Sequence, residues 1–121
     1  MKEIYLYING QFQTASDQKT FESLNPATQE VIAKCALPSP QDIDDAVESA
    51  EKSFKDWSQT SPHERATWLE KIADKMQEKF DDFTYFEMID SGATIKKARL
   101  DITSSIKTLR IHAEMTRDFV F

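Results

Sequence analysis

The sequence has 121 residues and a formal net charge of −6, with 21 acidic against 15 basic residues. A chain of this length forms one domain at most. The acidic balance leaves no stripe of Lys or Arg to displace counterions from a phosphate backbone, so we expect no nucleic acid among its partners. No stretch approaches the apolar length that spans a bilayer, and we expect no membrane contact either.

The cysteine content and the N-terminus bear on the cellular compartment. Cys35 is the only cysteine, which excludes an internal disulfide and a cysteine-based zinc site within one chain. The opening MKEIYLYING alternates in polarity, whereas a signal peptide needs an unbroken apolar run. We therefore expect a cytoplasmic protein.

Residues 1–37 predict two β-hairpins. Apolar residues alternate with tyrosines over residues 4–8, and Asn9-Gly10 then favours a type I′ turn between two antiparallel strands. A second, looser hairpin is predicted from strands at residues 21–24 and 30–36, which flank an Asn-Pro turn.

Three amphipathic helices are predicted next, over residues 39–58, 61–90 and 95–117. Ser39 and Ser61 each precede a proline, so each provides an N-cap hydroxyl followed by a residue that needs no N–H at the first helical position. Apolar residues recur at steps of three and four in all three segments. They are Ile43, Ala46, Val47, Ala50, Phe54 and Trp57, then Leu69, Ile72, Ala73, Met76, Phe80 and Phe83, and finally Ala98, Ile102, Ile106, Leu109 and Ala113. We predict an α+β chain whose other elements pack against the long second helix.

The ends of the last two helices carry further signals. Ser91-Gly92 predicts a left-handed stop after the long helix. Phe80 and Phe83 continue its apolar stripe, and we therefore interpret the aromatic run Phe80, Phe83, Tyr85 and Phe86 as core rather than as a ligand cleft. Residues 119–121 place apolar side chains at the carboxyl terminus, where a polar tail or a docked element is usual. We expect from this that the polypeptide once continued.

Side chains that carry chemistry are few. Gly10 and Gly92 are the only glycines, which excludes a Gly-rich phosphate-binding loop within the chain. His63 and His112 stand alone, without a second histidine one turn away. Cys35 lies on a predicted strand with no histidine nearby in the sequence, and we interpret it as a small buried hydrophobe. We predict no catalytic and no cofactor-binding residue within this chain.

An Asn-Gly hairpin, an Asn-Pro turn, two capped helices and an Asp-x-Gly stop follow one another along the chain. The residues are Tyr7-Ile8-Asn9-Gly10-Gln11-Phe12, Leu24-Asn25-Pro26-Ala27-Thr28-Gln29-Glu30-Val31-Ile32, Ala46, Val47, Ala50, Phe54, Trp57, Ser61, Arg65, Leu69, Ile72, Ala73, Glu87, Asp90 and Gly92. In this order they resemble the N-terminal part of the aldehyde dehydrogenase superfamily, over nearly the whole chain.

The resemblance implies an NAD(P)-dependent oxidation of an aldehyde to a carboxylic acid through a thiohemiacetal on a cysteine. Members of the superfamily carry the nucleophilic cysteine, the general-base glutamate, the oxyanion-hole asparagine and the cofactor-binding residues beyond the part matched here, and Cys35 does not match the nucleophile. The segment would belong to the cofactor-binding domain of an α/β Rossmann-like fold. Its partners would be the remainder of the same enzyme and the other subunits of a homo-oligomer.

Two groups of residues take a site role from the resemblance alone. Ser23, the backbone carbonyl of Leu24 and the carboxylate of Asp90 would form a site for Na⁺ or K⁺, cations that suit oxygen ligands. The alternative is that Asp90 only helps to end its helix. Leu100 and Ser104 would approach the entrance of the aldehyde tunnel.

One departure and one alternative function remain open at this point. Many relatives have glycine where this chain has Gln29. The backbone of Gln29 would be strained if this position needs a positive φ. The leading function is an N-terminal segment of an aldehyde dehydrogenase that is not catalytic by itself. The alternative is a non-enzymatic helical interaction or oligomerisation module that exposes Phe, Met and Trp faces. The aldehyde, the choice between NAD and NADP and the oligomeric state stay open.

Overall fold

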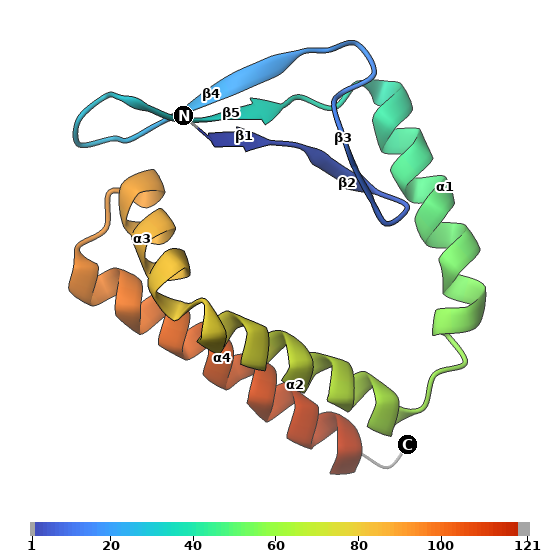
Figure 1. The fold of residues 1–121 in the computed structure, drawn as a ribbon. Helices are drawn as coiled ribbons and strands as arrows, with labels where there is room; N and C mark the ends of the chain where they lie inside the picture. The colour runs from blue at the N-terminus through green and yellow to red at the C-terminus, as the bar shows by residue number, and fades with distance from the viewer. Residues whose placement is uncertain (1, 119–121) are drawn as a thin grey trace. The chain divides into compact units, whose positions relative to one another are not determined.

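The computed structural model describes residues 2–118, and its contacts divide the chain into two compact units, Met1–Gln59 and Thr60–Phe121. The first unit contains β1 (Lys2–Ile4), β2 (Leu6–Ile8), β3 (Gln11–Gln13), β4 (Thr20–Leu24), β5 (Val31–Ala36) and α1 (Pro40–Trp57). The second contains α2 (Pro62–Glu78), α3 (Phe80–Ser91) and α4 (Ile95–Asp118) (Figure 1). This composition confirms the α+β class. The apolar end predicted to mark a continuing chain, residues 119–121, lies outside the described residues.

Both predicted hairpins are present in the first unit. Strands β2 and β3 pair antiparallel, and Asn9 and Gly10 take φ values of 51° and 75°, as a type I′ turn requires. Strands β4 and β5 also pair antiparallel. The turn between them places Gln29 at a φ of 63°, so this position does use the left-handed region that favours glycine.

Strand β1 has a pairing that two hairpins do not account for. Its residues pair in parallel with β5, with Lys2 opposite Ala33. Strand β5 is therefore the centre of a three-stranded sheet with the order β1-β5-β4. The strand predicted over residues 4–8 was wrong in its extent, because the chain leaves one sheet at Ile4 and enters the other at Leu6. Alternation alone gives no sign of a parallel partner that lies far along the sequence.

Helix α1 begins and ends where the sequence predicts. Ser39 is its N-cap, and a complete capping box joins Ser39 to Asp42. Two backbone amides and one hydroxyl at the start of the helix thus gain partners, which stabilises the first turn. Ser58 follows as the C-cap.

The prediction of one helix over residues 61–90 was wrong, because the segment forms α2 and α3 with a break at Lys79. That residue has φ −106° and ψ 25°, outside the helical region, and it caps the end of α2 and the start of α3. The acids Asp81 and Asp82 lie in the first turn of α3, where the positive end of a helix favours them. The break changes the direction of the chain so that α3 packs against α4. Gly92 ends α3 with a φ of 72°, as predicted.

The core of the second unit lies between α2 and α4. Buried residues Ala73, Ile102 and Ile106 form a cluster, against which Met76, Phe80 and Leu109 pack. The apolar face predicted for the third helix is thereby confirmed, with Ala98 and Ala113 also buried.

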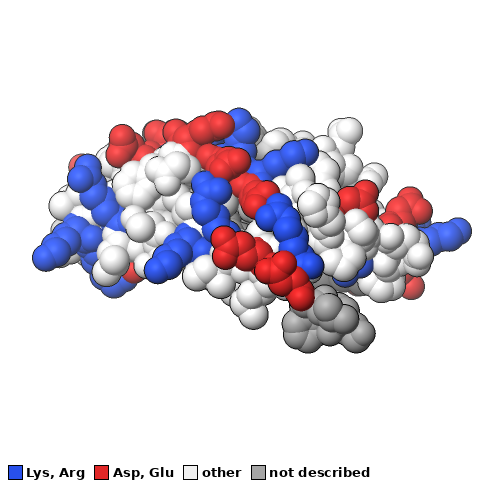
Figure 2. Space-filling view, turned by 90° about the horizontal axis from the view of Figure 1, so that it is seen from below, with Lys and Arg blue, Asp and Glu red and all other residues white. Residues whose placement is uncertain are grey.

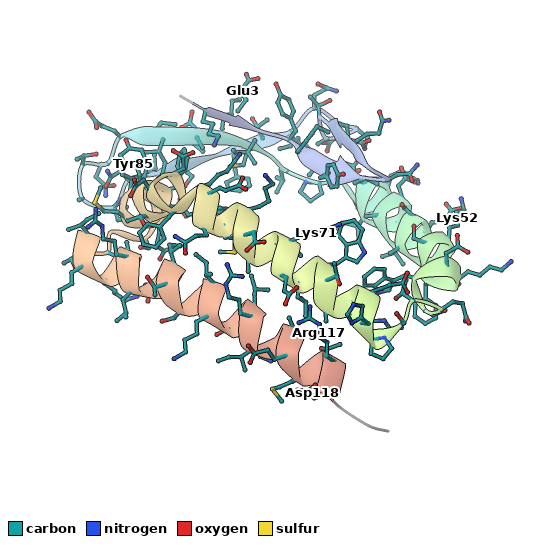
Figure 3. The ribbon with its side chains drawn as sticks, turned by 60° about the horizontal axis from the view of Figure 1, so that its bottom comes forward. Glu3, Lys52, Lys71, Tyr85, Arg117 and Asp118 are labelled. Atoms are coloured by element: carbon teal, nitrogen blue, oxygen red, sulfur yellow. The ribbon has the colours of Figure 1, made fainter. Side chains whose placement is uncertain are left out.

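Two ion pairs join α2 and α4 beside this core. Arg110 bonds Asp74 at 2.8 Å and Arg117 bonds Glu70 at 2.6 Å, and Arg117 lies on the side of α4 that faces α2 (Figure 3). Because later residues of α4 meet earlier residues of α2, the two helices run antiparallel. Basic and acidic side chains alternate across the middle of the face shown in Figure 2, and acidic side chains gather along its upper edge.

Some predicted core positions are exposed instead. The side chains of Phe83, Tyr85 and Phe86 are 40%, 53% and 41% exposed, because the break at Lys79 moves them off the stripe that α2 presents to α4. The core interpretation was therefore right for Phe80 alone within this aromatic run. Cys35 is half-buried rather than buried. Between residues 2 and 118, no helix combines the length and apolar character needed to cross a membrane.

Candidate functional site

The most fully built polar cluster among the described residues surrounds Asp42, at the start of α1. Its side chain is only 2% exposed. The carboxylate accepts the backbone N–H of Ser39 at 2.8 Å and the backbone N–H of Ser16 at 3.1 and 3.2 Å. The Ser16 hydroxyl also donates to it at 3.2 Å, and that hydroxyl lies 2.7 Å from the hydroxyl of Ser39. The cluster therefore fastens the loop after β3 to the first turn of α1.

These contacts determine the charge state of Asp42. The N–H of Ser39 lowers the pKa of its carboxyl most, burial acts in the opposite direction, and the N–H of Ser16 and both hydroxyls lower it further. A carboxylate held ionised in this way is poorly suited to exchange protons near neutral pH. The cluster has a structural role, as a clamp. The sequence places Asp42 at a helix start, but no local signal reveals Ser16, which lies 26 residues away.

The residues predicted to bind a monovalent cation lie in different units. Ser23 is half-buried on β4 and Leu24 ends that strand, with an irregularity in the β4–β5 pairing between the two. Asp90 is exposed near the end of α3. The structure thus brings Ser23 and Leu24 together as neighbours, and the three-residue cation site stays a prediction. Across residues 2–118 there is no group of three or more His, Cys, Asp or Glu side chains arranged to hold a metal ion.

The residues predicted to approach an aldehyde tunnel do share one surface. Leu100 and Ser104 lie one turn apart on α4, and both are exposed, Leu100 at 63%. At this spacing they occupy one face of the helix, away from the buried Ile102 and Ile106. Their role at a tunnel stays a prediction.

Comparison with known proteins decides the family. Residues 12–120, most of the chain, match the profile of the aldehyde dehydrogenase family. The chain belongs to the aldehyde dehydrogenase family.

Individual relatives agree with the assignment. The NADP/NAD-dependent aldehyde dehydrogenase PuuC of Escherichia coli is 37% identical over 112 residues, which are 90% of this chain and 23% of that protein. A solved aldehyde dehydrogenase from Bacillus cereus superposes with a TM-score of 0.92 at 34% identity, covering 98% of this chain and 25% of that one. A salicylaldehyde dehydrogenase from Pseudomonas putida gives a TM-score of 0.90 at 31% identity, over 95% of this chain and 24% of that one. The chain thus spans about a quarter of the length of these relatives.

Proposed function

We propose that this chain supplies the N-terminal hairpins and helices of an NAD(P)-dependent aldehyde dehydrogenase and is not catalytic by itself. The activity of the whole enzyme would be the oxidation of an aldehyde to a carboxylic acid through a thiohemiacetal on a cysteine. In that enzyme the present residues would act as scaffold, with the Asp42 clamp fixing the start of α1 against the loop after β3.

One observation carries the proposal. The superposition on the Bacillus cereus enzyme, with a TM-score of 0.92, includes 98% of this chain but only 25% of that enzyme. The cofactor class is supported by PuuC, whose name gives both NADP and NAD, and by the Bacillus cereus enzyme, which has been solved as an NAD⁺ complex. A scaffold role is also favoured by the two glycines, which stand far apart in the sequence, and by the hydrogen bonds that the Asp42 carboxylate accepts from Ser39 and Ser16.

A chimera tests the proposal. Residues 1–121 would replace the matching N-terminal segment of the Bacillus cereus aldehyde dehydrogenase, and the readout would be reduction of NAD⁺ in the presence of an aldehyde. We expect an active chimera and no reduction above the no-enzyme blank from the isolated chain. The Bacillus cereus enzyme without its N-terminal segment is the control.

Either part of the proposal can fail separately. A chimera that folds and binds NAD⁺ but oxidises no aldehyde would contradict the scaffold assignment. Reduction of NAD⁺ or NADP⁺ by the isolated chain would contradict its lack of catalysis.

The remaining roles belong to the same proposal. The resemblance supports a Na⁺ or K⁺ site that uses Ser23, Leu24 and Asp90, and a tunnel entrance near Leu100 and Ser104. It also supports the remainder of the enzyme and further subunits as partners in the cytoplasm.

A second candidate, a non-enzymatic interaction module, is favoured by the exposed apolar side chains of α1. Val47 and Phe54 are 62% and 65% exposed, and Trp57 is 47% exposed. Exposed apolar surface of this kind marks interaction sites in soluble proteins. An inactive chimera together with a stable oligomer of the isolated chain would support this candidate over the first.

A further inference from the structure

The turn between β2 and β3 holds an asparagine next to a glycine. Asn9 is exposed with φ 51°, and Gly10 has φ 75° with no atom within 4 Å of the position that a Cβ would occupy. Gly10 therefore has no side chain beside its backbone nitrogen, and the space that a Cβ would occupy is open, the two neighbouring residues aside. Asparagine is among the chemically labile residues of proteins, and the glycine that follows Asn9 has no Cβ to obstruct attack by its nitrogen on the Asn9 side chain.

We propose that Asn9 is a site of spontaneous deamidation, with water as the co-reactant, and that its conversion loosens the β2–β3 hairpin from α1. The nitrogen of Gly10 attacks Cγ of Asn9, a new C–N bond closes a succinimide ring, and the bond to the side-chain nitrogen breaks. That nitrogen leaves as ammonia with the proton of the Gly10 amide. Water then opens the ring at either carbonyl and gives aspartate or isoaspartate. No group is oxidised or reduced.

The other asparagine of the chain provides a contrast. Asn9 and Asn25 are the only two asparagines, and Asn25 precedes Pro26. Proline has no backbone N–H, so its nitrogen cannot close the ring.

Conversion of Asn9 changes a contact between the hairpin and α1. Its side-chain oxygen accepts a hydrogen bond from the hydroxyl of Ser49 on α1 at 3.4 Å. Asn9 also lines a hollow of about 450 Å³ between these elements, together with Asp45, Glu48 and Asp56. Aspartate at position 9 adds a negative charge beside three acids, and like charges repel.

The basic side chain of this hollow does not offset the new charge. Lys52 lines the same hollow and extends from α1 (Figure 3), where its ammonium group already bonds Glu48 at 2.6 Å. Isoaspartate has a second effect, because it routes the backbone through the side chain and lengthens the chain by one CH₂ group. A two-residue type I′ turn has no room for the added length.

Mass spectrometry of the aged protein tests the reaction. The folded chain would be incubated at mildly alkaline pH and digested with trypsin, which releases residues 3–19 with Asn9 and residues 20–34 with Asn25. We expect the first peptide to gain the mass difference between an OH and an NH₂ group, and to split into aspartate and isoaspartate forms on chromatography. The second peptide should keep its mass. An unchanged first peptide from the folded chain, or equal conversion of both peptides, would overturn the proposal.

The matched variants Asn9→Asp and Asn25→Asp test the structural consequence. Both add one negative charge, but only the first adds it beside the acids of α1. We expect faster amide hydrogen exchange over residues 6–13 in Asn9→Asp and no change there in Asn25→Asp. Equal exchange in Asn9→Asp and the unaltered chain would show that deamidation leaves the hairpin in place, contrary to the proposal.

Discussion

At the scale of single residues, Gln29 stores backbone strain in the turn between β4 and β5. Its φ of 63° costs a residue with a Cβ about 1–2 kcal/mol. We predict that Gln29→Gly raises the free energy of unfolding by about 0.5 kcal/mol. The relief of strain exceeds the greater entropy that glycine has in the unfolded chain together with the loss of the exposed bond from the Gln29 side-chain amide to the carbonyl of Pro26. Urea denaturation measures the change.

Gln18 is the control for this prediction, because its φ of 60° is nearly the same. Its side-chain amide donates to the hydroxyl of Thr14 at 3.1 Å and to the carbonyl of Ala15 at 3.2 Å. Gln18→Gly loses both bonds, whereas Gln29→Gly loses only the one that its side-chain amide donates to the carbonyl of Pro26 at 3.0 Å. Gln18→Gly should therefore gain less stability than Gln29→Gly. A loss of stability in Gln29→Gly would contradict the strain argument.

The second residue-scale prediction concerns the pH dependence of the Asp42 clamp. Its folded-state pKa is lowered, first by the N–H of Ser39, relative to an unfolded value of about 3.9. Its contribution to stability is therefore present above that unfolded value and is lost as the pH falls through the lower folded value. We predict that Asp42→Asn lowers the melting temperature at neutral pH, and that the difference from the unaltered chain shrinks as the pH falls below about 4.

Asp44→Asn is the matched control for the clamp, since it removes the same charge from an exposed neighbour on α1. Thermal melts of both variants over the acid range make the comparison. Equal melting temperatures for the two variants at neutral pH would show that the buried contacts of Asp42 add no stability.

At the scale of elements, α3 buries a hydroxyl group that has no partner. Thr84 is 2% exposed, and its Oγ1 has no hydrogen bond among the described residues. We predict that Thr84→Val raises the free energy of unfolding by about 1 kcal/mol, because a buried unpaired hydroxyl costs about 1–3 kcal/mol and valine keeps the shape. Thr84→Ser keeps the hydroxyl and loses a methyl, so it should lower stability. Urea denaturation of both variants tests the prediction, and a less stable Thr84→Val would refute it.

The ends of elements could be predicted wherever their signals are local. Ser39 and Ser61 precede prolines at helix starts, and Gly92 ends α3, because a cap acts on residues within one turn of itself. The break at Lys79 could not be predicted in this way. The residues just before it, Lys75-Met76-Gln77-Glu78, favour a helix. Neither a glycine nor a capping side chain marks an end at Lys79.

The same distinction applies to the candidate sites. The shared face of Leu100 and Ser104 follows from a spacing of four on a helix, and Ser23 and Leu24 are neighbours in sequence. Asp42 was assigned to a helix start, but its clamp needs Ser16 from a loop two strands earlier in the chain. Contacts of that kind depend on the tertiary fold, and a single sequence carries no periodic or capping signal for them.

At the scale of the whole molecule, large apolar side chains remain exposed in both units, and α1 carries a dense set of them. Its residue Ser49 faces the hairpin, whereas Val47 and Phe54 lie on the other side of the helix. We predict that the isolated chain associates at high concentration, because exposed apolar area is removed from water on association. The double variant Val47→Gln and Phe54→Gln should shift the mean mass in light scattering toward the monomer.

Glu51→Gln is the control for this prediction, since it changes an exposed polar residue of the same helix. It should leave the mean mass unchanged. A monomer at every concentration of the unaltered chain would contradict the prediction and would weigh against the interaction module as the function.

The parallel pairing of β1 with β5 has a consequence for the order of folding. Strand β1 is synthesised before the other strands of this unit, and its neighbour in the sheet, β5, is synthesised only after β2, β3 and β4. The β2–β3 hairpin closes within a few residues, whereas the β1–β5 ladder has to close a loop that contains three other strands, and long loops close more slowly. Strand β1 is thus among the last strands of this unit to pair. A nascent chain that stops before Val31 would have β2 paired with β3 while β1 is not yet paired with β5.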